Sequence, residues 1–338
     1  MKVLIVKLSA FGDIIHALPA LDDVLARPEV SEVHWLVDSR FAFVTEIFPP
    51  QVKVHKVALK GTHRIRHAWR MIQTLRRENF DIILELQGLI KSGLMAWGAT
   101  KSHTRVYGFD RQQSPEYPNH WFVNTVDFHA DEQHVVQKYR HIATAPFISQ
   151  SDAALPTPYK APHVKFKASN ANLLQTLGIQ AQHYTLLHVG GGWKTKQLPE
   201  TTWQQLNQTL ELQQTQVIIS WGSESEQSLA QSIAKNSNAI VLPQRLEIHA
   251  LCQLLQQSQA VIGMDTGVLH LAAALQASTI TLWGPSASWN SAPLGTQHRH
   301  IESNPECGPC FKRQCDDFIC MPSLSAQTIV KAWLEVKK

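Results

Sequence analysis

The chain has 338 residues, of which 44% are hydrophobic and 17% are charged, and its formal net charge at pH 7 is +4. This length exceeds what one hydrophobic core usually carries, so we expect two domains with ordinary cores. No stretch approaches the roughly 18 consecutive apolar residues of a membrane span, which excludes an integral membrane helix and predicts a soluble protein.

The chain opens with an apolar strand at residues 3–6, a polar turn from Lys7 to Asp13, and a helical pattern over residues 14–26. Lys7, Asp13 and His16 interrupt any continuous apolar centre, so we interpret this opening as part of the fold and not as a secretory signal. A cytoplasmic protein with reduced thiols is therefore expected.

The turn after the first strand carries Gly12 and Asp13. A carboxylate at this position either acts as a general base on an incoming hydroxyl or caps the helix that follows. Because the preceding glycine permits close approach of a substrate, we favour the catalytic interpretation.

A basic segment runs from Lys60 to Arg77, and no acidic residue interrupts it before Glu78. Its apolar residues recur at helical spacing, which predicts an amphipathic helix. The basic side either faces solvent or binds an anionic partner. No nucleic-acid-binding module accompanies the segment, so we expect no nucleic-acid partner.

Short apolar runs that alternate with helical patterns predict two α/β domains with mostly parallel sheets. The expected strands lie at 33–37, 52–57, 82–86, 184–189, 217–220, 260–264 and 279–283, and the expected later helices at 200–214, 224–235, 246–257 and 325–336. Three prolines within residues 154–162 predict a linker. We therefore place an N-terminal domain at 1–158, a C-terminal domain at 159–322, and a final helix within 323–338 that packs on either domain, including back on the first.

Two turns of the second half carry groups suited to a phosphorylated sugar. Gly190, Gly191 and Gly192 free the backbone to surround phosphate oxygens, and Lys194 or Lys196 can neutralise a departing diphosphate. A flexible loop is the alternative, because the spacing is not that of a Walker loop. In the turn at residues 220–226, Glu224 or Glu226 either accepts hydrogen bonds from ribose or sugar hydroxyls or complements the helix dipole.

A third turn, formed by Asp265, Thr266 and Gly267, joins an apolar strand to a helix of small residues. The N-terminus of a helix offers unpaired N–H groups and a partial positive charge, so this turn is typical of a phosphate site. His270 lies on the same helix, either as a ligand contact or as a packed core histidine.

The cysteines at positions 307, 310, 315 and 320 form one CxxC pair followed by two wider spacings. A structural clamp of the loop is our first interpretation, with free thiols, disulfides and zinc all open. No histidine or carboxylate cluster accompanies them, so we expect no catalytic metal. No strand-turn-helix unit carries GxGxxG, which argues against a dehydrogenase.

Taken together, five motifs resemble those of the lipopolysaccharide heptosyltransferases of glycosyltransferase family 9, and most of all the heptosyltransferase I branch. The motifs span residues 7–21, 86–92, 221–226, 265–270 and 282–285. The resemblance implies an α/β GT-B fold, in which two Rossmann-like domains face each other across a central cleft. The N-terminal domain would bind the acceptor and the C-terminal domain the nucleotide sugar.

The resemblance also implies a reaction. It is the inverting, metal-independent transfer of L-glycero-D-manno-heptose from ADP-heptose to a Kdo residue of Kdo-lipid A, with no cofactor, at the cytoplasmic face of the inner membrane and in peripheral contact with it. A later core acceptor is an alternative, as are a nucleotide-sugar epimerase and a non-catalytic GT-B protein that binds a nucleotide or an anionic glycolipid.

The site residues that the resemblance implies fall into three groups. Asp13 would be the catalytic base, and Lys196 would assist departure of ADP. The donor would be held by Gly191, Gly192, Lys196, Glu226, Asp265, Thr266, Gly267 and His270. The acceptor would be held by Lys7, Gly12, Lys60, Arg64, Arg66 and Gln87.

Overall fold

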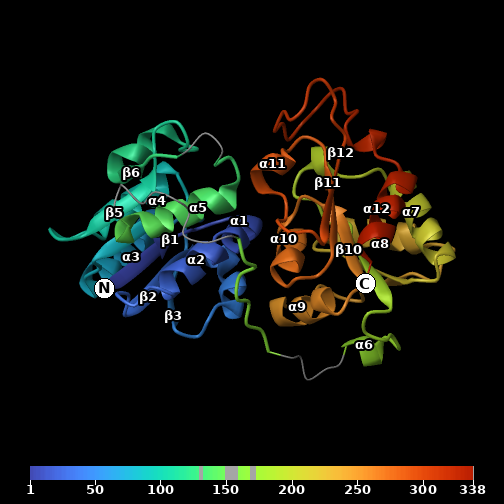
Figure 1. The fold of residues 1–338 in the computed structure, drawn as a ribbon, viewed down its shortest axis with the longest axis horizontal. Coiled ribbons are helices and arrows are strands. Elements are labelled where there is room, and N and C mark those ends of the chain that lie inside the picture. The colour runs from blue at the N-terminus through green and yellow to red at the C-terminus, as the bar shows by residue number, and fades with distance from the viewer. Residues whose placement is uncertain (129–131, 149–158, 168–172, 338) are drawn as a thin grey trace. The chain divides into compact units, whose positions relative to one another are not determined.

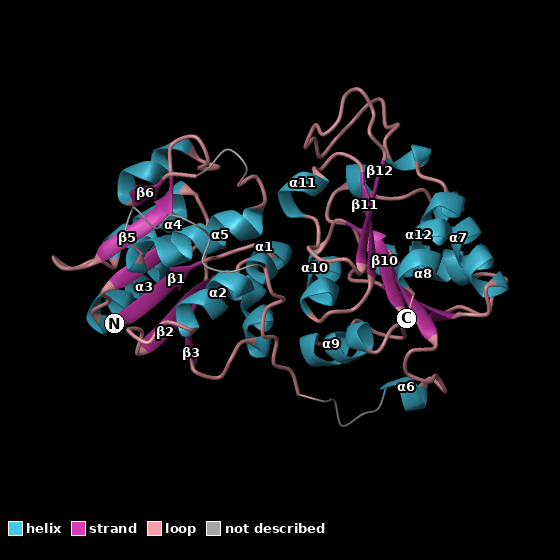
Figure 2. Cartoon of the chain, viewed as in Figure 1, coloured by secondary structure: helices cyan, strands magenta, loops and turns pink. Residues whose placement is uncertain are grey.

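The computed structural model describes residues 1–128, 132–148, 159–167 and 173–337 and divides into two compact units, residues 1–165 and 166–338 (Figure 1). The predicted domain boundary after residue 158 borders a segment, 149–158, that lies outside the described residues. Figure 2 shows that each unit contains a sheet flanked by helices. The α/β class predicted from the alternating pattern is confirmed.

The first unit contains a parallel sheet that has six strands in the described part of the chain, in the order β3-β2-β1-β4-β5-β6. Its strands are β1 (Lys2–Val6), β2 (Glu32–Asp38), β3 (Val52–Val57), β4 (Ile82–Glu85), β5 (Arg105–Phe109) and β6 (Asn124–Val126). Its helices are α1 (Phe11–His16), α2 (Leu18–Leu25), α3 (Arg64–Glu78), α4 (Ile90–Gly98) and α5 (Val135–Thr144), with 3₁₀ segments η1 (Ser39–Ile47), η2 (Tyr117–Phe122) and η3 (Ala145–Phe147).

The second unit repeats this topology: its parallel sheet, again counted over the described residues, has six strands in the order β12-β11-β10-β7-β8-β9. Its strands are β7 (Tyr184–His188), β8 (Gln216–Ser220), β9 (Ile240–Val241), β10 (Ala260–Met264), β11 (Thr279–Trp283) and β12 (His298–Glu302). Its helices are α6 (Leu173–Thr176), α7 (Glu200–Leu212), α8 (Glu224–Ala234), α9 (Ile248–Gln256), α10 (Gly267–Ala274), α11 (Ser288–Ser291) and α12 (Ala326–Val336), with 3₁₀ segments η5 (Lys194–Lys196) and η6 (Met321–Ser323).

The strand order reverses between β1 and β4 in the first sheet and between β7 and β10 in the second. Open parallel sheets bind ligands beyond the carboxyl ends of their strands at this switch point, where the loops of two neighbouring strands diverge. The fold therefore specifies one candidate site in each unit before any side chain is considered.

Four strands were not predicted from the sequence, namely β5, β6, β9 and β12. β6 and β12 are the outermost strands in their sheets, and β12 reads His-Arg-His-Ile-Glu. An edge strand exposes part of its surface and so lacks the continuous apolar run that marks a strand buried on both faces.

The final helix α12 packs on α7, β11 and β12 of the second unit. Ala326, Ile329 and Trp333 are buried in the core of that unit, and Trp333 Nε1 donates a hydrogen bond of 2.8 Å to Thr185 Oγ1 on β7. Of the two domains that the sequence left open for this helix, the second is the one on which it packs. Its amphipathic pattern shows that it buries one face, but not which sheet receives it.

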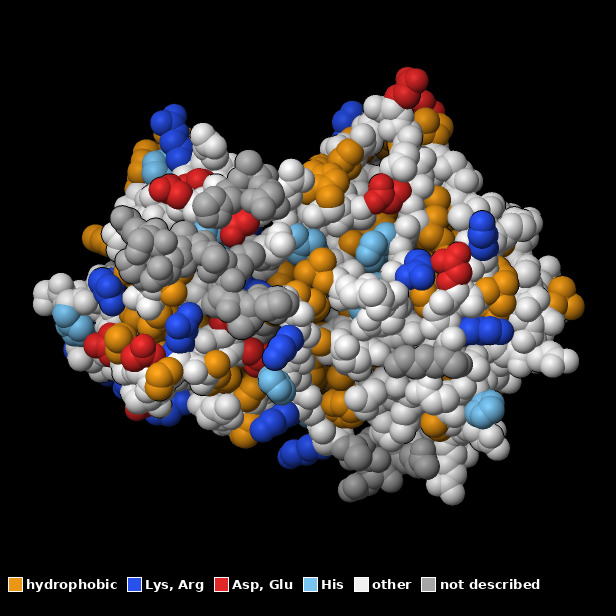
Figure 3. Space-filling view, viewed as in Figure 1, with side chains coloured by type: hydrophobic (Ala, Val, Ile, Leu, Met, Phe, Trp, Pro, Cys, Tyr) orange, Lys and Arg blue, Asp and Glu red, His pale blue; other side chains and the backbone are white. Residues whose placement is uncertain are grey.

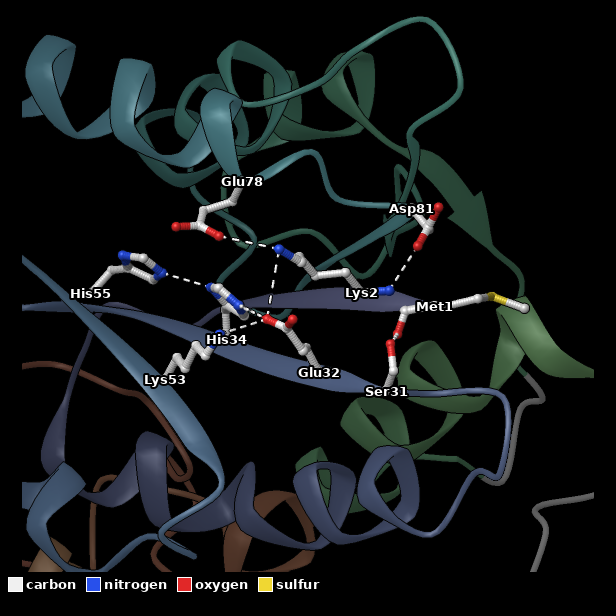
Figure 4. A network of polar contacts seen from close by, with 9 residues as sticks. All are labelled: Met1, Lys2, Ser31, Glu32, His34, Lys53, His55, Glu78 and Asp81. Atoms are coloured by element: carbon white, nitrogen blue, oxygen red, sulfur yellow. Dashed lines mark hydrogen bonds and ion pairs between the residues drawn. The ribbon is translucent and has the colours of Figure 1, made fainter.

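A polar network joins the amino ends of β1, β2 and β3, at the edge of the first sheet opposite the switch-point loops (Figure 4). Glu32 Oε2 accepts hydrogen bonds from Lys53 Nζ at 2.7 Å and from His34 Nε2 at 3.1 Å, and Lys2 Nζ lies 3.6 Å from it. The hydrogen bonds from Lys53 and His34 lower the pKa of Glu32 to about 2. His34 is buried and stacks on His55. We interpret this network as structural.

Candidate active site

In the first unit, the switch point brings together the loop after β1 and the loop after β4. Lys7 is buried, and its Nζ donates hydrogen bonds to Leu86 O at 2.9 Å and to Tyr139 Oη at 2.6 Å. Burial lowers the pKa of Lys7, although the nearby carboxylates of Asp13 and Glu85 oppose this shift. Lys7 thus places a buried cation beside the carboxylate predicted to act as the base.

Gln87 fixes the loop that leads to Asp13. Its Oε1 accepts hydrogen bonds of 3.0 Å from the N–H groups of both Leu8 and Ser9. Buried Glu85, just before it, accepts hydrogen bonds from the N–H groups of Gln87 and Gly88. The sequence predicted that Gln87 contacts the glycosyl acceptor. In the structure, its amide oxygen has a structural role, because it joins the loop after β4 to the loop after β1.

Asp13 lies in the first turn of α1, after Gly12, and is partly exposed. Its Oδ2 accepts a hydrogen bond of 3.0 Å from Ala10 N, as a capping carboxylate does. Among the described residues, no hydrogen bond is made to its other oxygen, Oδ1. Asp13 therefore caps α1 from the N3 position inside the helix and is not the N-cap that the sequence suggested. This arrangement is compatible with a role as base, because no hydrogen bond within the described residues occupies Oδ1.

Lys60, Arg64 and Arg66 follow the carboxyl end of β3 and enter the first turn of α3. All three are exposed, and none makes an ion pair within the described parts of the chain. The loops after β1 and β3 emerge at the same edge of a parallel sheet, so this basic group lies at the edge that carries Asp13.

In the second unit, Lys196 and Asp265 meet at the switch point between β7 and β10. Lys196 Nζ forms an ion pair with Asp265 Oδ2 and lies 4.4 Å from the ring centroid of Trp193. Asp265 Oδ1 lies 3.0 Å from His270 Nε2. Burial alone would raise the pKa of Asp265, but the hydrogen bond and charge of His270, together with Lys196, lower it. Asp265 is therefore an anion held between two basic groups.

Thr266 caps α10, and Gly267 is the first residue of this helix. The side chain of Thr266 makes no capping hydrogen bond, and its buried Oγ1 has no hydrogen-bond partner among the described residues. A buried hydroxyl without a partner is costly unless a ligand satisfies it. Together with the free N–H groups of the first turn, it forms a cradle suited to a phosphate.

Glu226 joins the loops after β7 and β8. Its Oε1 accepts a hydrogen bond of 3.2 Å from Gly191 N, and its Oε2 accepts one of 2.8 Å from Gly222 N. Gly192 is exposed, and a side chain at this position would meet no atom within 4 Å. The structure thus brings Gly191 and Glu226 together and leaves Gly192 at the open side of the loop.

The cysteine loop, residues 307–320, is tied to the loop that carries Lys196. Thr195 Oγ1 donates a hydrogen bond of 2.7 Å to Lys312 O, and the guanidinium of Arg313 lies 5.1 Å from the ring centroid of Trp193. All four cysteines of this loop are free thiols that line one small pocket. Lys312 and Arg313 thus attach this loop to the loop that carries Lys196, and the clamp predicted for the cysteines stays a prediction.

Sequence reasoning missed several residues of these sites, among them Tyr139, Glu85 and Trp193. It also missed His188, whose Nδ1 lies 3.0 Å from Ser220 Oγ and whose pKa burial lowers to about 4. His188 and Glu85 end their strands at the switch points, so their position was the available signal. Tyr139 had none, because it reaches Lys7 from α5.

Two general properties complete the description. None of the described helices combines the length and the apolar character that crossing a bilayer requires. No group of three or more histidine, cysteine or acidic side chains within the described residues is arranged to hold a metal ion.

Comparison with known proteins gives consistent matches over most of the chain. Residues 68–317 match the sequence profile of glycosyltransferase family 9 (heptosyltransferase). The chain is 31% identical over 323 residues to lipopolysaccharide heptosyltransferase 1 of Pseudomonas aeruginosa, covering 93% of this chain and 87% of that protein.

Solved structures match along the whole chain. The structure of E. coli heptosyltransferase WaaC with ADP-2-deoxy-2-fluoro heptose has a TM-score of 0.75 and 25% identity, covering 99% of both chains. E. coli ADP-heptose lipopolysaccharide heptosyltransferase II has a TM-score of 0.76 at 18% identity, covering 99% of this chain and 98% of that one, and so supports the fold alone. The predicted GT-B fold, with a Rossmann-like sheet in each unit, is confirmed.

Proposed function

Because the chain belongs to glycosyltransferase family 9, the heptosyltransferases, we propose that it transfers L-glycero-D-manno-heptose from ADP-heptose to a Kdo residue of Kdo-lipid A. The observation that carries this proposal is the second switch point, where a lysine, a helix N-terminus and an unpartnered threonine hydroxyl meet. The relative from P. aeruginosa is named a lipopolysaccharide heptosyltransferase, and the solved E. coli enzyme contains ADP-2-deoxy-2-fluoro heptose, which supports a lipopolysaccharide acceptor and an ADP-heptose donor.

The donor would bind at this second site with its diphosphate on the first turn of α10. Thr266 Oγ1 would donate its hydrogen to a phosphate oxygen, and Lys196 would share its charge between Asp265 and the diphosphate. Gly191 and Gly192 would allow the backbone to approach the phosphates, and Gly267 would do so at the helix terminus.

Two further side chains would complete the donor site. Glu226 would use the remaining acceptor capacity of its carboxylate for the ribose hydroxyls, since each oxygen already takes one backbone N–H. His270 would act mainly through Asp265, which it holds in place and keeps ionised.

The acceptor would bind at the first site. Lys60, Arg64 and Arg66 are exposed cations at the edge that carries Asp13, and they would hold the anionic groups of Kdo-lipid A. Gly12 would leave room for the sugar beside Asp13. Lys7 and Gln87 would act indirectly. Gln87 would fix the loop that leads to Asp13, and Lys7 would set the charge next to it.

Transfer would be an inverting displacement. Asp13 would accept the proton of the Kdo hydroxyl as its oxygen bonds to the anomeric carbon and the bond from that carbon to the diphosphate breaks. The pair of electrons would leave with ADP, and Lys196 together with the α10 terminus would stabilise the developing charge. This proposal draws on no metal and no cofactor.

We place this reaction at the cytoplasmic face of the inner membrane, because the acceptor is a lipid and the donor a water-soluble nucleotide sugar. The protein would associate with that surface peripherally.

One assay tests the proposed function directly: release of ADP from ADP-heptose by the purified protein, with and without a Kdo-containing acceptor. We expect acceptor-dependent release and a heptosylated product. An altered heptose formed without acceptor would indicate an epimerase, and donor binding without turnover would indicate a binding protein. Turnover only on a core that already carries heptose would indicate a later acceptor.

A further inference from the structure

The surface formed by α3, α4 and η2 exposes an unusual number of large apolar side chains. Trp69 and Trp97 are 59% and 60% exposed, Ile65 is 78% exposed, and Trp121 is 69% exposed. The amphipathic helix predicted within residues 60–77 is α3, and Leu75, in its C-terminal half, is its buried apolar residue. Exposed tryptophans in this number mark a surface that contacts something apolar.

The apolar side chains form lines along their helices. On α4, Ile90, Leu94 and Trp97 recur at the spacing of one helix face, and all three are exposed. On α3, Ile65 and Trp69 share a face with Ile72 in the same way.

These lines meet where the two helices pack together. A side chain at Gly98 would meet Ile72 at 2.8 Å, so Gly98 allows α3 to pack closely beside Trp97. Trp97 in turn lies against Phe122 of η2, with ring centroids 6.5 Å apart. The exposed apolar side chains therefore come from three elements that pack side by side.

Basic side chains lie along the same elements. Arg70 and Arg77 lie on α3 about 80–100° around the helix from Trp69, and Lys91 and Lys101 lie in and just after α4. All four are exposed, and neither residues 60–77 nor residues 89–101 contain an acid. On the face drawn in Figure 3, by contrast, basic side chains are scattered among other types. Exposed tryptophan with surrounding arginine and lysine is typical of a helix that lies in a membrane interface.

The position of this surface relative to the first site indicates a function for it. α3 and α4 follow β3 and β4, so both helices begin at the carboxyl edge of the sheet. Ile65 and Ile90, in their first turns, therefore lie toward the edge that carries Asp13, as do Arg64 and Arg66. A lipid-linked acceptor held by the basic group would keep its acyl chains in the bilayer beneath this surface.

We infer that this surface, formed by Ile65, Trp69, Leu94, Trp97 and Trp121 with Arg70, Arg77, Lys91 and Lys101, docks the protein on an anionic phospholipid bilayer. The tryptophan rings insert at the level of the headgroups, and the basic side chains contact lipid phosphates. This inference rests on the proposed function only for the identity of the lipid acceptor. Binding to the bilayer itself requires no substrate.

The test measures binding of the full chain to vesicles of phosphatidylglycerol and phosphatidylethanolamine by co-sedimentation, with vesicles of phosphatidylcholine alone for comparison. We expect binding to the anionic vesicles only, weakened by salt. Arg70→Gln with Arg77→Gln should weaken it about 25-fold, from about fivefold per charge. Trp69→Ser with Trp97→Ser should weaken it about tenfold or more.

Leu212→Ser is the matched control, because Leu212 is an exposed apolar residue of the second unit and its loss should leave binding unchanged. Equal binding to neutral vesicles, no binding, or self-association that the tryptophan variant abolishes would each overturn the inference. Turnover of a deacylated, water-soluble Kdo acceptor should be normal in all variants. If the unaltered protein fails on that acceptor while still binding vesicles, the proposed function fails and the docking surface stands.

Discussion

His270 Nε2 lies 3.0 Å from Asp265 Oδ1, while the other oxygen of this carboxylate pairs with Lys196. One buried anion thus holds two basic groups at the N-terminus of α10. This arrangement holds Lys196 in place before a donor arrives, so that little reorganisation is needed when charge develops on the diphosphate.

Lys196→Gln should lower kcat about 100-fold or more, because the charge on departing ADP would lose its nearest cation. Lys194→Gln is the matched control: Lys194 is exposed, makes no ion pair among the described residues, and should tolerate the change within about twofold. Steady-state ADP release measures both. Equal losses of kcat in the two variants would show that Lys196 does not act in the chemical step.

Thr266→Val should weaken ADP binding about tenfold while leaving the free energy of unfolding unchanged or higher. The reason is that Thr266 Oγ1 has no partner within the described chain, so removing it costs the empty protein nothing and costs the complex one hydrogen bond to a charged group. Calorimetry of ADP binding and urea unfolding provide the two values, and Thr266→Ser should bind ADP normally. A variant that unfolds more easily yet binds ADP normally would show that the hydroxyl has a structural role instead.

Tyr139→Phe should lower the free energy of unfolding by about 1–3 kcal/mol, because buried Lys7 loses the hydroxyl that accepts its hydrogen bond. The ring, 4.4 Å from Nζ, stays in place. A double-mutant cycle with Lys7→Met isolates this interaction. If the two effects simply add, the pair is not coupled and Tyr139 does not hold Lys7.

Acidification should destabilise the second unit through His188. Burial lowers the pKa of His188 from 6.5 to about 4, so the unfolded chain binds its proton more tightly than the folded one. The stability associated with this histidine is therefore complete above pH 6.5 and is lost as the pH falls from 6.5 to about 4, by about 3 kcal/mol.

Urea unfolding of His188→Asn measured at several pH values tests this prediction. The His188→Asn variant should lose less stability than the unaltered protein between pH 6.5 and 4. His103→Asn, at an exposed position, should lose as much stability as the unaltered protein. Parallel pH profiles for all three proteins would contradict the assignment.

The sequence predicted those parts of the fold that depend on patterns within a short segment. Strands buried on both faces read as continuous apolar runs, so β1, β4, β7 and β10 were found, and with them the turns after β1, β7 and β10. Edge strands such as β12 carry no such run.

The site was predictable only as far as the turns themselves. Asp13, Lys196 and Asp265 lie in the connections that follow β1, β7 and β10, which is why their sequence context indicated a function. Their partners come from distant elements: Tyr139 reaches Lys7 from α5, and Lys312 reaches Thr195 from the cysteine loop. Such pairs depend on how distant elements pack together, which the periodicity of the sequence does not predict.

The most direct test of the account is the turnover of Asp13→Asn on ADP-heptose and a Kdo acceptor, measured together with its affinity for ADP. Asparagine can still accept the hydrogen bond from Ala10 N, so the helix cap is kept while the proton acceptor is lost. We expect kcat to fall about 100- to 10,000-fold with ADP affinity unchanged. Turnover close to that of the unaltered protein would contradict the account.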